Sequence, residues 1–212
     1  MSKDLQSNYI DKEAMHGAQN YSPLPVVLKK GDGVYLWDVN DKKYLDMMSA
    51  YSAVSHGHSH PELVETLVNQ SKKLAIASRA FYTEPLADYI EKLSKLSGFT
   101  SVLPMNTGAE AVETAIKAAR RWGYFTKGVE EDKAEIIVAD GNFHGRTTTI
   151  VGFSSEPDYK KGFGPFSNGF KTAEYCSSNC DCSKVCELSI NSIESLITEN
   201  TCAVLVEPIQ GE

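Results

Sequence analysis

The chain has 212 residues, 42% of them hydrophobic, and a formal net charge of −7 at pH 7. This apolar content can bury the core of one large domain, or of a domain with an appendage. The acidic balance gives no electrostatic footprint for nucleic acid, and no apolar run is long enough to span a bilayer. The first residues include Asp4, Asp11 and Glu13, whereas a transit peptide is poor in acids. We therefore expect a cytoplasmic protein with neither nucleic acid nor membrane as a partner.

An antiparallel meander is the first predicted element, in residues 26–47. The turn formers Asp32-Gly33 and Asn40-Asp41 separate runs of residues that favour strands. We assign residues 1–55 to a small N-terminal α+β lobe that contains this meander.

Two helices are predicted next. The first begins at Pro61, which suits the first turn of a helix, and continues with apolar residues at helical spacing through Leu74. The second begins near Pro85 and ends at Gly98, because glycine commonly terminates a helix.

Short apolar runs then alternate with helical segments. Candidate strands at Val102-Leu103, 136–138 and 203–206 are joined by segments that include a helix from Ala109 to about Tyr124. Apolar strands separated by helices indicate an α/β fold, with a mostly parallel sheet and helices on both faces. We assign residues 56–212 to this domain. Such sheets bind ligands at the carboxyl ends of their strands, so the loops there are the candidates for chemistry.

The first of these loops is Thr107-Gly108-Ala109, which opens the predicted helix. Small residues at a helix start leave backbone N–H groups open to an anion, and the helix dipole favours negative charge, so a phosphate would fit. Thr107 with Glu110 also has the spacing of a capping box, which any helix can use. The motif alone favours the cap.

Two further loops follow strands and contain unusual residues. In residues 141–147, Phe143 could stack on a flat ring and Arg146 could grip a carboxylate with two hydrogen bonds, but for an isolated loop a core phenylalanine and a solvated arginine are the favoured interpretation. Glu207 and Glu212 in the last loop are suggestive but unspecific.

Taken together, the three loops resemble the class III aminotransferases, which depend on pyridoxal 5′-phosphate. Other stretches are similar to the ornithine aminotransferases within that family. The phrases shared with class III aminotransferases are NTGAEA (106–111), NFHGRT (142–147) and VEPIQGE (206–212). The stretches similar to ornithine aminotransferases are 20–46, 49–63 and 78–82. The resemblance covers nearly the whole chain, and it implies a fold-type I aminotransferase architecture of which this chain is the truncated N-terminal half.

The resemblance also implies residue roles, and it reverses the preference for a simple helix cap. The implied cofactor residues are Thr107, Gly108 and Ala109 at the phosphate, Phe143 on the pyridine ring with His144 beside it, and Glu207. The implied substrate residues are Arg146 for the α-carboxylate of ornithine, Tyr21 and Tyr51 for ornithine selection, and Glu212, which pairs with an arginine outside this chain.

The implied reaction transfers the δ-amino group of L-ornithine to 2-oxoglutarate in a homodimer, with the mitochondrial matrix as the second candidate compartment. The family's cofactor-binding lysine has no counterpart, because no lysine here stands in a matching motif. We therefore assign no catalytic residue and expect the chain alone to be inactive. The alternatives are a truncated, non-catalytic paralogue that binds a partner, and a related transaminase acting on acetylornithine or 4-aminobutyrate.

Histidines and cysteines raise the question of a metal. His56, His58 and His60 alternate without accompanying ligands of known spacing, and the family has a similar turn without metal. Four cysteines, at 176, 180, 182 and 186, lie in a stretch at about 172–189 that we interpret as an inserted surface loop or as an artefact of gene prediction, since their spacing fits no common zinc pattern. We expect no metal at either place.

Overall fold

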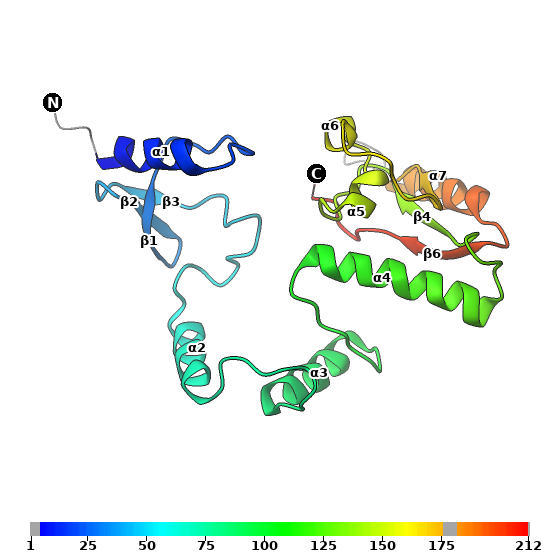
Figure 1. The fold of residues 1–212 in the computed structure, drawn as a ribbon, viewed down its shortest axis with the longest axis horizontal. Helices are drawn as coiled ribbons and strands as arrows, with labels where there is room; N and C mark the ends of the chain where they lie inside the picture. The colour runs from blue at the N-terminus through cyan, green and yellow to red at the C-terminus, as the bar shows by residue number, and fades with distance from the viewer. Residues whose placement is uncertain (1–4, 176–181, 212) are drawn as a thin grey trace. The chain divides into compact units, whose positions relative to one another are not determined.

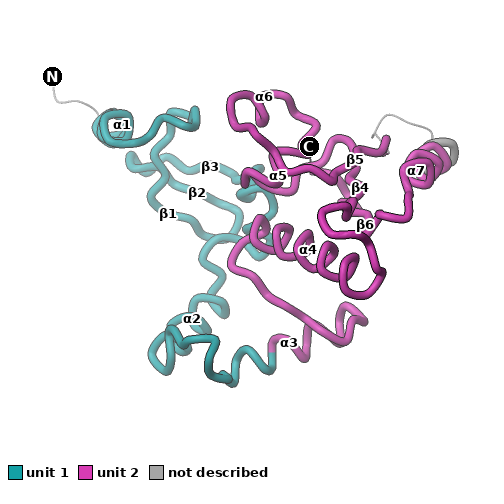
Figure 2. Tube along the Cα trace, turned by 45° about the vertical axis from the view of Figure 1, so that its right-hand side comes forward, with its two compact units in different colours: residues 1–88 teal, residues 89–212 magenta. Residues whose placement is uncertain are grey.

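The computed structural model describes residues 5–175 and 182–211, without the side chains of 182–186. Contacts divide the chain into two compact units, residues 1–88 and 89–212 (Figure 2). We call them unit 1 and unit 2 and describe each by itself. The division places residues 56–88 with unit 1, while the domain boundary expected after residue 55 stays a prediction.

Unit 1 contains the predicted meander. Strands β1 (Leu28–Asp32), β2 (Tyr35–Asp38) and β3 (Lys43–Leu45) follow helix α1 (Leu5–His16) and form an antiparallel sheet in the order β1-β2-β3 (Figure 1). Its two turns contain Gly33 at φ 57° and Asp41 at φ 65°. Glycine adopts this left-handed conformation without penalty and aspartate tolerates it, so the turn residues set the hairpins.

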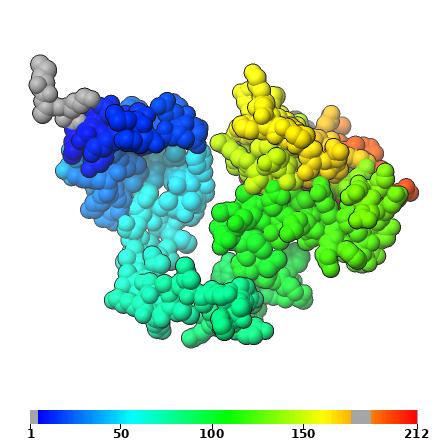
Figure 3. Space-filling view, in the orientation of Figure 1, coloured from blue at the N-terminus to red at the C-terminus, as the bar shows by residue number. Residues whose placement is uncertain are grey.

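Helices α2 (Pro61–Lys73) and α3 (Glu84–Ser97) confirm the two predicted helices. Gly98, at φ 76°, follows α3 as the expected stop. Neither helix has a buried residue, and α2 lies at the surface in the space-filling view (Figure 3). The apolar stripe that predicted α2 therefore faces solvent in this chain.

Unit 2 contains a parallel sheet in the order β5-β4-β6, which confirms the predicted α/β class. The strands are β4 (Glu135–Ala139), β5 (Phe170–Ala173) and β6 (Thr201–Leu205). The helices are α4 (Gly108–Trp122), the π-helix η1 (Gly123–Lys127), α5 (Thr148–Gly152), α6 (Pro157–Lys160) and α7 (Cys182–Leu196). The predicted strand at Val102-Leu103 is wrong. The run has only two apolar residues, Leu103 is 70% exposed, and the next residue is a proline without an N–H to donate.

The core of unit 2 joins the sheet to α4 and α5. Ile116, Ile136, Val138, Ile150 and Phe153 form one buried cluster. The alternate residues of β4, 137 and 139, point to the other face and are also buried, as expected for a sheet covered on both sides. The parallel strands end at one edge, where the loops after β4 and β6 begin.

The stretch predicted as an insertion, 172–189, lies partly outside the described residues. Its first two residues end β5 and its last part forms the start of α7, while residues 176–181 are not described. Among the described residues, no helix is long and apolar enough to cross a membrane.

Candidate active site

Hydrogen bonds join the loops that follow β4 and β6 at the carboxyl edge of the sheet. The Phe143 amide donates to Glu207 Oε2 at 3.0 Å, and Gln210 Nε2 donates to the Asp140 carbonyl at 2.7 Å. The structure therefore brings together residues 64 and 70 positions apart, and Phe143 and Glu207 are neighbours.

The side-chain cap at the start of α4 pairs only some of the backbone amides there. Thr107 Oγ1 accepts from the Glu110 amide at 3.1 Å, and Glu110 Oε2 accepts from the Asn106 amide at 2.9 Å. The amides of Gly108 and Ala109 belong to the first turn, so they have no acceptor within the helix. A Cβ at Gly108 would meet no atom within 4 Å. The cap uses the third amide and leaves the first two without an acceptor in the helix, with open space beside Gly108.

Gly145 places the 141–147 loop against this helix start. It has φ +127°, and an added Cβ would lie 3.1 Å from Ala109 Cβ and 3.3 Å from Ile150 Cδ1. Both the backbone conformation and the close approach require glycine. The candidate anion site and the loop of Phe143 are therefore adjacent.

Asn142, which the sequence did not single out, fixes the beginning of this loop. It is 5% exposed, and its Nδ2 donates to the carbonyls of Ala139 at 2.6 Å and Phe153 at 3.3 Å. Only the fold brings these two carbonyls to one side chain, so sequence spacing gives no signal for this role.

His144 is a half-buried imidazole with an unused nitrogen. Its Nε2 is buried and has no hydrogen-bond partner among the described residues. Burial lowers the pKa of His144, and the negative charge of Glu207 offsets part of this effect. The ring is therefore held neutral beside a carboxylate, with Phe153 at 6.1 Å between ring centroids.

Two aromatic rings lie close to the guanidinium of Arg146. Its guanidinium lies 4.9 Å from the ring centroid of Tyr159 and 5.8 Å from that of Phe143, and the two rings meet edge to face at 6.1 Å. No carboxylate pairs with Arg146 in the described part of the chain. Tyr159, in α6, was not singled out from the sequence because no local pattern links it to residues 143–146.

The two predicted tyrosines of unit 1 lie together. The hydroxyls of Tyr21 and Tyr51 are 3.4 Å apart although the residues are 30 positions apart, and their side chains are 62% and 79% exposed. Tyr21 also lines a cavity of about 1000 Å³ formed by α1 and the segment that follows it. Glu212 lies outside the described residues.

The alternating histidines have different surroundings. His58 Nε2 lies 2.7 Å from Asp46 Oδ2, while the rings of His56 and His60 meet at 6.3 Å. Within the described ranges, no group of three His, Cys, Asp or Glu residues could hold a metal ion. The cysteines at 176 and 180 and the side chains of those at 182 and 186 lie outside those ranges, so the expectation for them stays untested.

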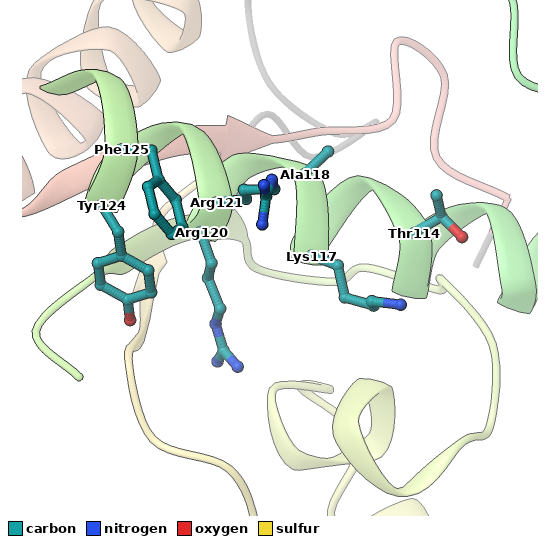
Figure 4. A pocket seen from close by; sticks show the side chains of 7 residues that line it. All are labelled: Thr114, Lys117, Ala118, Arg120, Arg121, Tyr124 and Phe125. Atoms are coloured by element: carbon teal, nitrogen blue, oxygen red, sulfur yellow. The ribbon is translucent and has the colours of Figure 1, made fainter. Parts of the chain in front are cut away.

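A separate cavity of about 490 Å³ lies along α4 and η1 (Figure 4). Its lining residues are Thr114, Lys117, Ala118, Arg120, Arg121, Tyr124 and Phe125. Arg120 donates to the Asn168 carbonyl at 3.0 Å, and the Arg121 guanidinium lies 4.7 Å from the ring centroid of Phe125. None of the predicted site residues lines this cavity.

Comparison with known proteins gives related sequences and folds. An ornithine aminotransferase of Brevibacillus brevis is 50% identical over 203 residues, which are 96% of this chain and 48% of that protein. The crystal structure of the Toxoplasma gondii ornithine aminotransferase has a TM-score of 0.89 at 34% identity, covering 99% of this chain and 47% of that one. A second structure of that enzyme has partial occupancy of PLP at its active site.

The acetylornithine aminotransferase of Elizabethkingia anophelis is also similar, with a TM-score of 0.78 at 52% identity over 98% of this chain and 48% of that one. The chain spans about half the length of the curated relatives that it matches. The family described as aminotransferase class-III matches residues 16–212. The chain belongs to the class III aminotransferase family.

Proposed function

We propose that this chain belongs to an ornithine aminotransferase, which transfers the δ-amino group of L-ornithine to 2-oxoglutarate and forms glutamate 5-semialdehyde and glutamate. The observation that carries the proposal is the pair of tyrosine hydroxyls, Tyr21 and Tyr51, at 3.4 Å. Both tyrosines stand in stretches that resemble ornithine aminotransferases, and the 50% identity to the Brevibacillus brevis relative supports the same assignment.

The residues present fit pyridoxal 5′-phosphate. The free amides of Gly108 and Ala109 and the dipole of α4 suit a phosphate, and the open space at Gly108 leaves room for one. Phe143 offers a flat face for a pyridine ring, and the unused Nε2 of His144 offers a polar group beside it. When bound, the cofactor supplies the electron sink for amino-group transfer.

The remaining residues bind the substrate in this proposal. Arg146 takes the α-carboxylate in a two-pronged grip, and the rings of Tyr159 and Phe143 restrict its side chain. Tyr21 accepts a hydrogen bond from the α-amino group. Holding both α-substituents leaves the δ-amine as the reacting end. We assign Glu212 to a pair with an arginine outside this chain.

We also propose a homodimer. The described helix α2 exposes an apolar stripe, in which Leu67 is 70% exposed, and an exposed stripe of this kind is typical of a surface that another chain or segment covers. Sedimentation of the purified protein measures this directly.

Acetylornithine is the second candidate substrate, because the Elizabethkingia anophelis relative with 52% identity is an acetylornithine aminotransferase. Acetylation removes the charge of the α-amino group, so a site built for that charge discriminates between the two compounds.

An exchange chimera tests the proposal. In it, this chain replaces the matched 203 residues of the Brevibacillus brevis relative. We expect kcat/KM for L-ornithine to exceed the values for N-acetyl-L-ornithine and 4-aminobutyrate by about tenfold or more, the effect of one well-placed polar contact. Higher efficiency with N-acetyl-L-ornithine would support the second candidate. An inactive chimera, beside an active unmodified relative, would contradict both.

A further inference from the structure

Tyr51 lies in a turn with an uncommon backbone. Four successive residues, Ser49, Ala50, Tyr51 and Ser52, have φ values of 45°, 48°, 53° and 72°. The left-handed region is disfavoured for every residue with a side chain, and glycine, which adopts it freely, is absent from this turn. Contacts outside these four residues must therefore hold the turn in place.

Asp46 makes contacts of this kind. Its Oδ1 accepts from the amides of Met48 and Ser49, each at 2.9 Å, and its Oδ2 lies 2.7 Å from His58 Nε2. The Asp46 side chain is only 9% exposed. Hydrogen bonds from His58, Ser49 and Met48 lower the pKa of Asp46, so the carboxylate is ionised at neutral pH and accepts all three.

His58 ties the same carboxylate to the meander. The His58 amide donates to the Gly33 carbonyl at 2.8 Å, and the Gly33 amide donates to the His58 carbonyl at 3.0 Å. A Cβ at Gly31 would lie 2.7 Å from the His58 ring, so the ring packs directly on β1. Asp46 therefore links the left-handed turn to the hydrogen-bonded frame of unit 1.

The turn has its own hydrogen bonds, which depend on its handedness. The Tyr51 amide donates to the Met48 carbonyl at 3.0 Å, and the Val54 amide donates to the Ser49 carbonyl at 3.1 Å. The result is a tyrosine whose backbone is fixed while its side chain is exposed and its hydroxyl reaches that of Tyr21.

We propose that Asp46 is a positioning residue for Tyr51, and that it thereby contributes to the selection of the amine substrate. The second half of this statement rests on the proposed function. The first half concerns the turn alone and is testable without any activity.

Asp38 provides a matched control for Asp46. It also accepts two backbone amides, from Asn40 and Lys42 at 2.9 Å each, and a side-chain donor, Tyr44, at 2.8 Å. It holds a different turn, which contains no proposed site residue. If substitution of Asp46 acted only through a general loss of order in unit 1, substitution of Asp38 would have the same effect on the turn of Tyr51. We expect that effect from substitution of Asp46 alone.

Hydrogen exchange of the 212-residue chain tests the turn. We expect Asp46→Ala to speed amide exchange in residues 48–54 about tenfold or more, as the loss of hydrogen bonds to a charged acceptor predicts. Asp46→Asn keeps one oxygen for the two amides and should give a smaller increase. Asp38→Asn should leave this segment unchanged. Equal exchange in the parent and Asp46→Ala, or an equal increase with Asp38→Asn, would overturn the proposal.

Kinetics of the exchange chimera test the effect on selection. We expect Asp46→Asn to lower the ratio of kcat/KM for L-ornithine to that for 4-aminobutyrate, and to have little further effect when Tyr51→Phe is already present, because the two residues act through one hydroxyl. An unchanged ratio, or fully additive losses, would refute the role in selection. If the parent chimera does not use L-ornithine, the proposed function and the role in selection fail together, and the exchange experiment still decides the role of Asp46 in the turn.

Discussion

The two units hold their candidate site residues in different ways. Among the described residues, every buried hydrophobic side chain lies between Ile116 and Ala173 in unit 2, whereas the one buried residue of unit 1 is the charged Asp38, at 3% exposed. The loops of unit 2 rest on a packed sheet. In unit 1, Tyr51 lies in a turn whose amides donate to the carboxylate of Asp46.

This difference predicts different sensitivities. Apolar packing responds to the loss of volume, while hydrogen-bonded turns respond to the loss of an acceptor or of its charge. The chain contains two tryptophans, Trp37 in unit 1 and Trp122 in unit 2. The variant Trp122→Phe therefore keeps Trp37 as the fluorescent reporter of unit 1, and the variant Trp37→Phe keeps Trp122 as the reporter of unit 2.

The largest expected effect is in the core of unit 2. Ile137 is fully buried, so Ile137→Ala should lower the free energy of unfolding by about 2–5 kcal/mol through lost burial and a residual cavity. Urea titration followed by Trp122 fluorescence measures it. The matched control is Ile76→Ala in unit 1, at a residue that is 89% exposed and should change stability by about 0.5 kcal/mol or less. Similar losses in both variants would contradict the contrast between the units.

A smaller effect is expected where the site loop meets α4. Gly145→Ala adds a methyl group against Ala109 at a positive φ and should cost about 1–3 kcal/mol. Gly98→Ala has a positive φ but nothing within 4 Å, so it should cost only the backbone contribution, about 1–2 kcal/mol. Thermal unfolding of both variants compares them. A larger loss for Gly98→Ala would mean that the loop does not press on α4.

Acid should act on the turns of unit 1. Burial raises the pKa of Asp38, but the hydrogen bonds from Tyr44 and the amides of Lys42 and Asn40 outweigh it, so the pKa is lowered; that of Asp46 is lowered as well. A lowered pKa stabilises the folded state above the unfolded value, near pH 4, and this stabilisation is lost as the pH falls through the folded value.

Trp37 fluorescence between pH 7 and pH 2 should therefore change below about pH 4. The change should shrink when Asp38→Asn and Asp46→Asn are combined, because both carboxylates are then removed. The same acid transition in the parent and in the double variant would rule out these two carboxylates as its cause.

The smallest effect is expected for a surface ion pair of the same meander. Lys29 Nζ lies 2.8 Å from Asp41 Oδ1, and the Asp41 side chain is 80% exposed. Asp41→Asn should change stability by about 0.5 kcal/mol or less, since water screens an exposed pair. A urea midpoint that shifts as much as it does for Asp38→Asn would show that charge in general, and not amide binding, orders the meander.

The sequence predicts elements whose signal is local. The turns at Gly33 and Asp41, the helix start at Pro61 and the apolar strands β4 and β6 were all recovered in this way. Strand β5, Phe170-Lys171-Thr172-Ala173, was missed because it has no continuous apolar run and is defined by its pairing with β4.

For the candidate site, too, local patterns predicted the loops but not the residues that hold them in place. The loops of Phe143 and Glu207 were predicted from their position after strands and from family phrases, whereas the loop of Gly108 was predicted from its helix start and its family phrase, since the strand expected before it is absent from the described residues. The partners that fix them, Asn142 and Tyr159, depend on tertiary contacts. The left-handed turn 49–52 contains no glycine, asparagine or aspartate, so the four residues themselves give no sequence signal for a left-handed backbone.

The central claim is that Tyr21 serves the α-amino group of ornithine, and one comparison tests it most directly. In the exchange chimera, Tyr21→Phe removes one hydroxyl, and kcat/KM is measured for L-ornithine and for 4-aminobutyrate, which has no α-amino group. We predict a loss of about tenfold or more for L-ornithine, the effect of one unsatisfied polar partner, and no loss for 4-aminobutyrate. Tyr9→Phe, on the wall of the same cavity, should change neither value. An equal loss for both substrates in Tyr21→Phe would mean that Tyr21 only supports the fold, and would contradict the account.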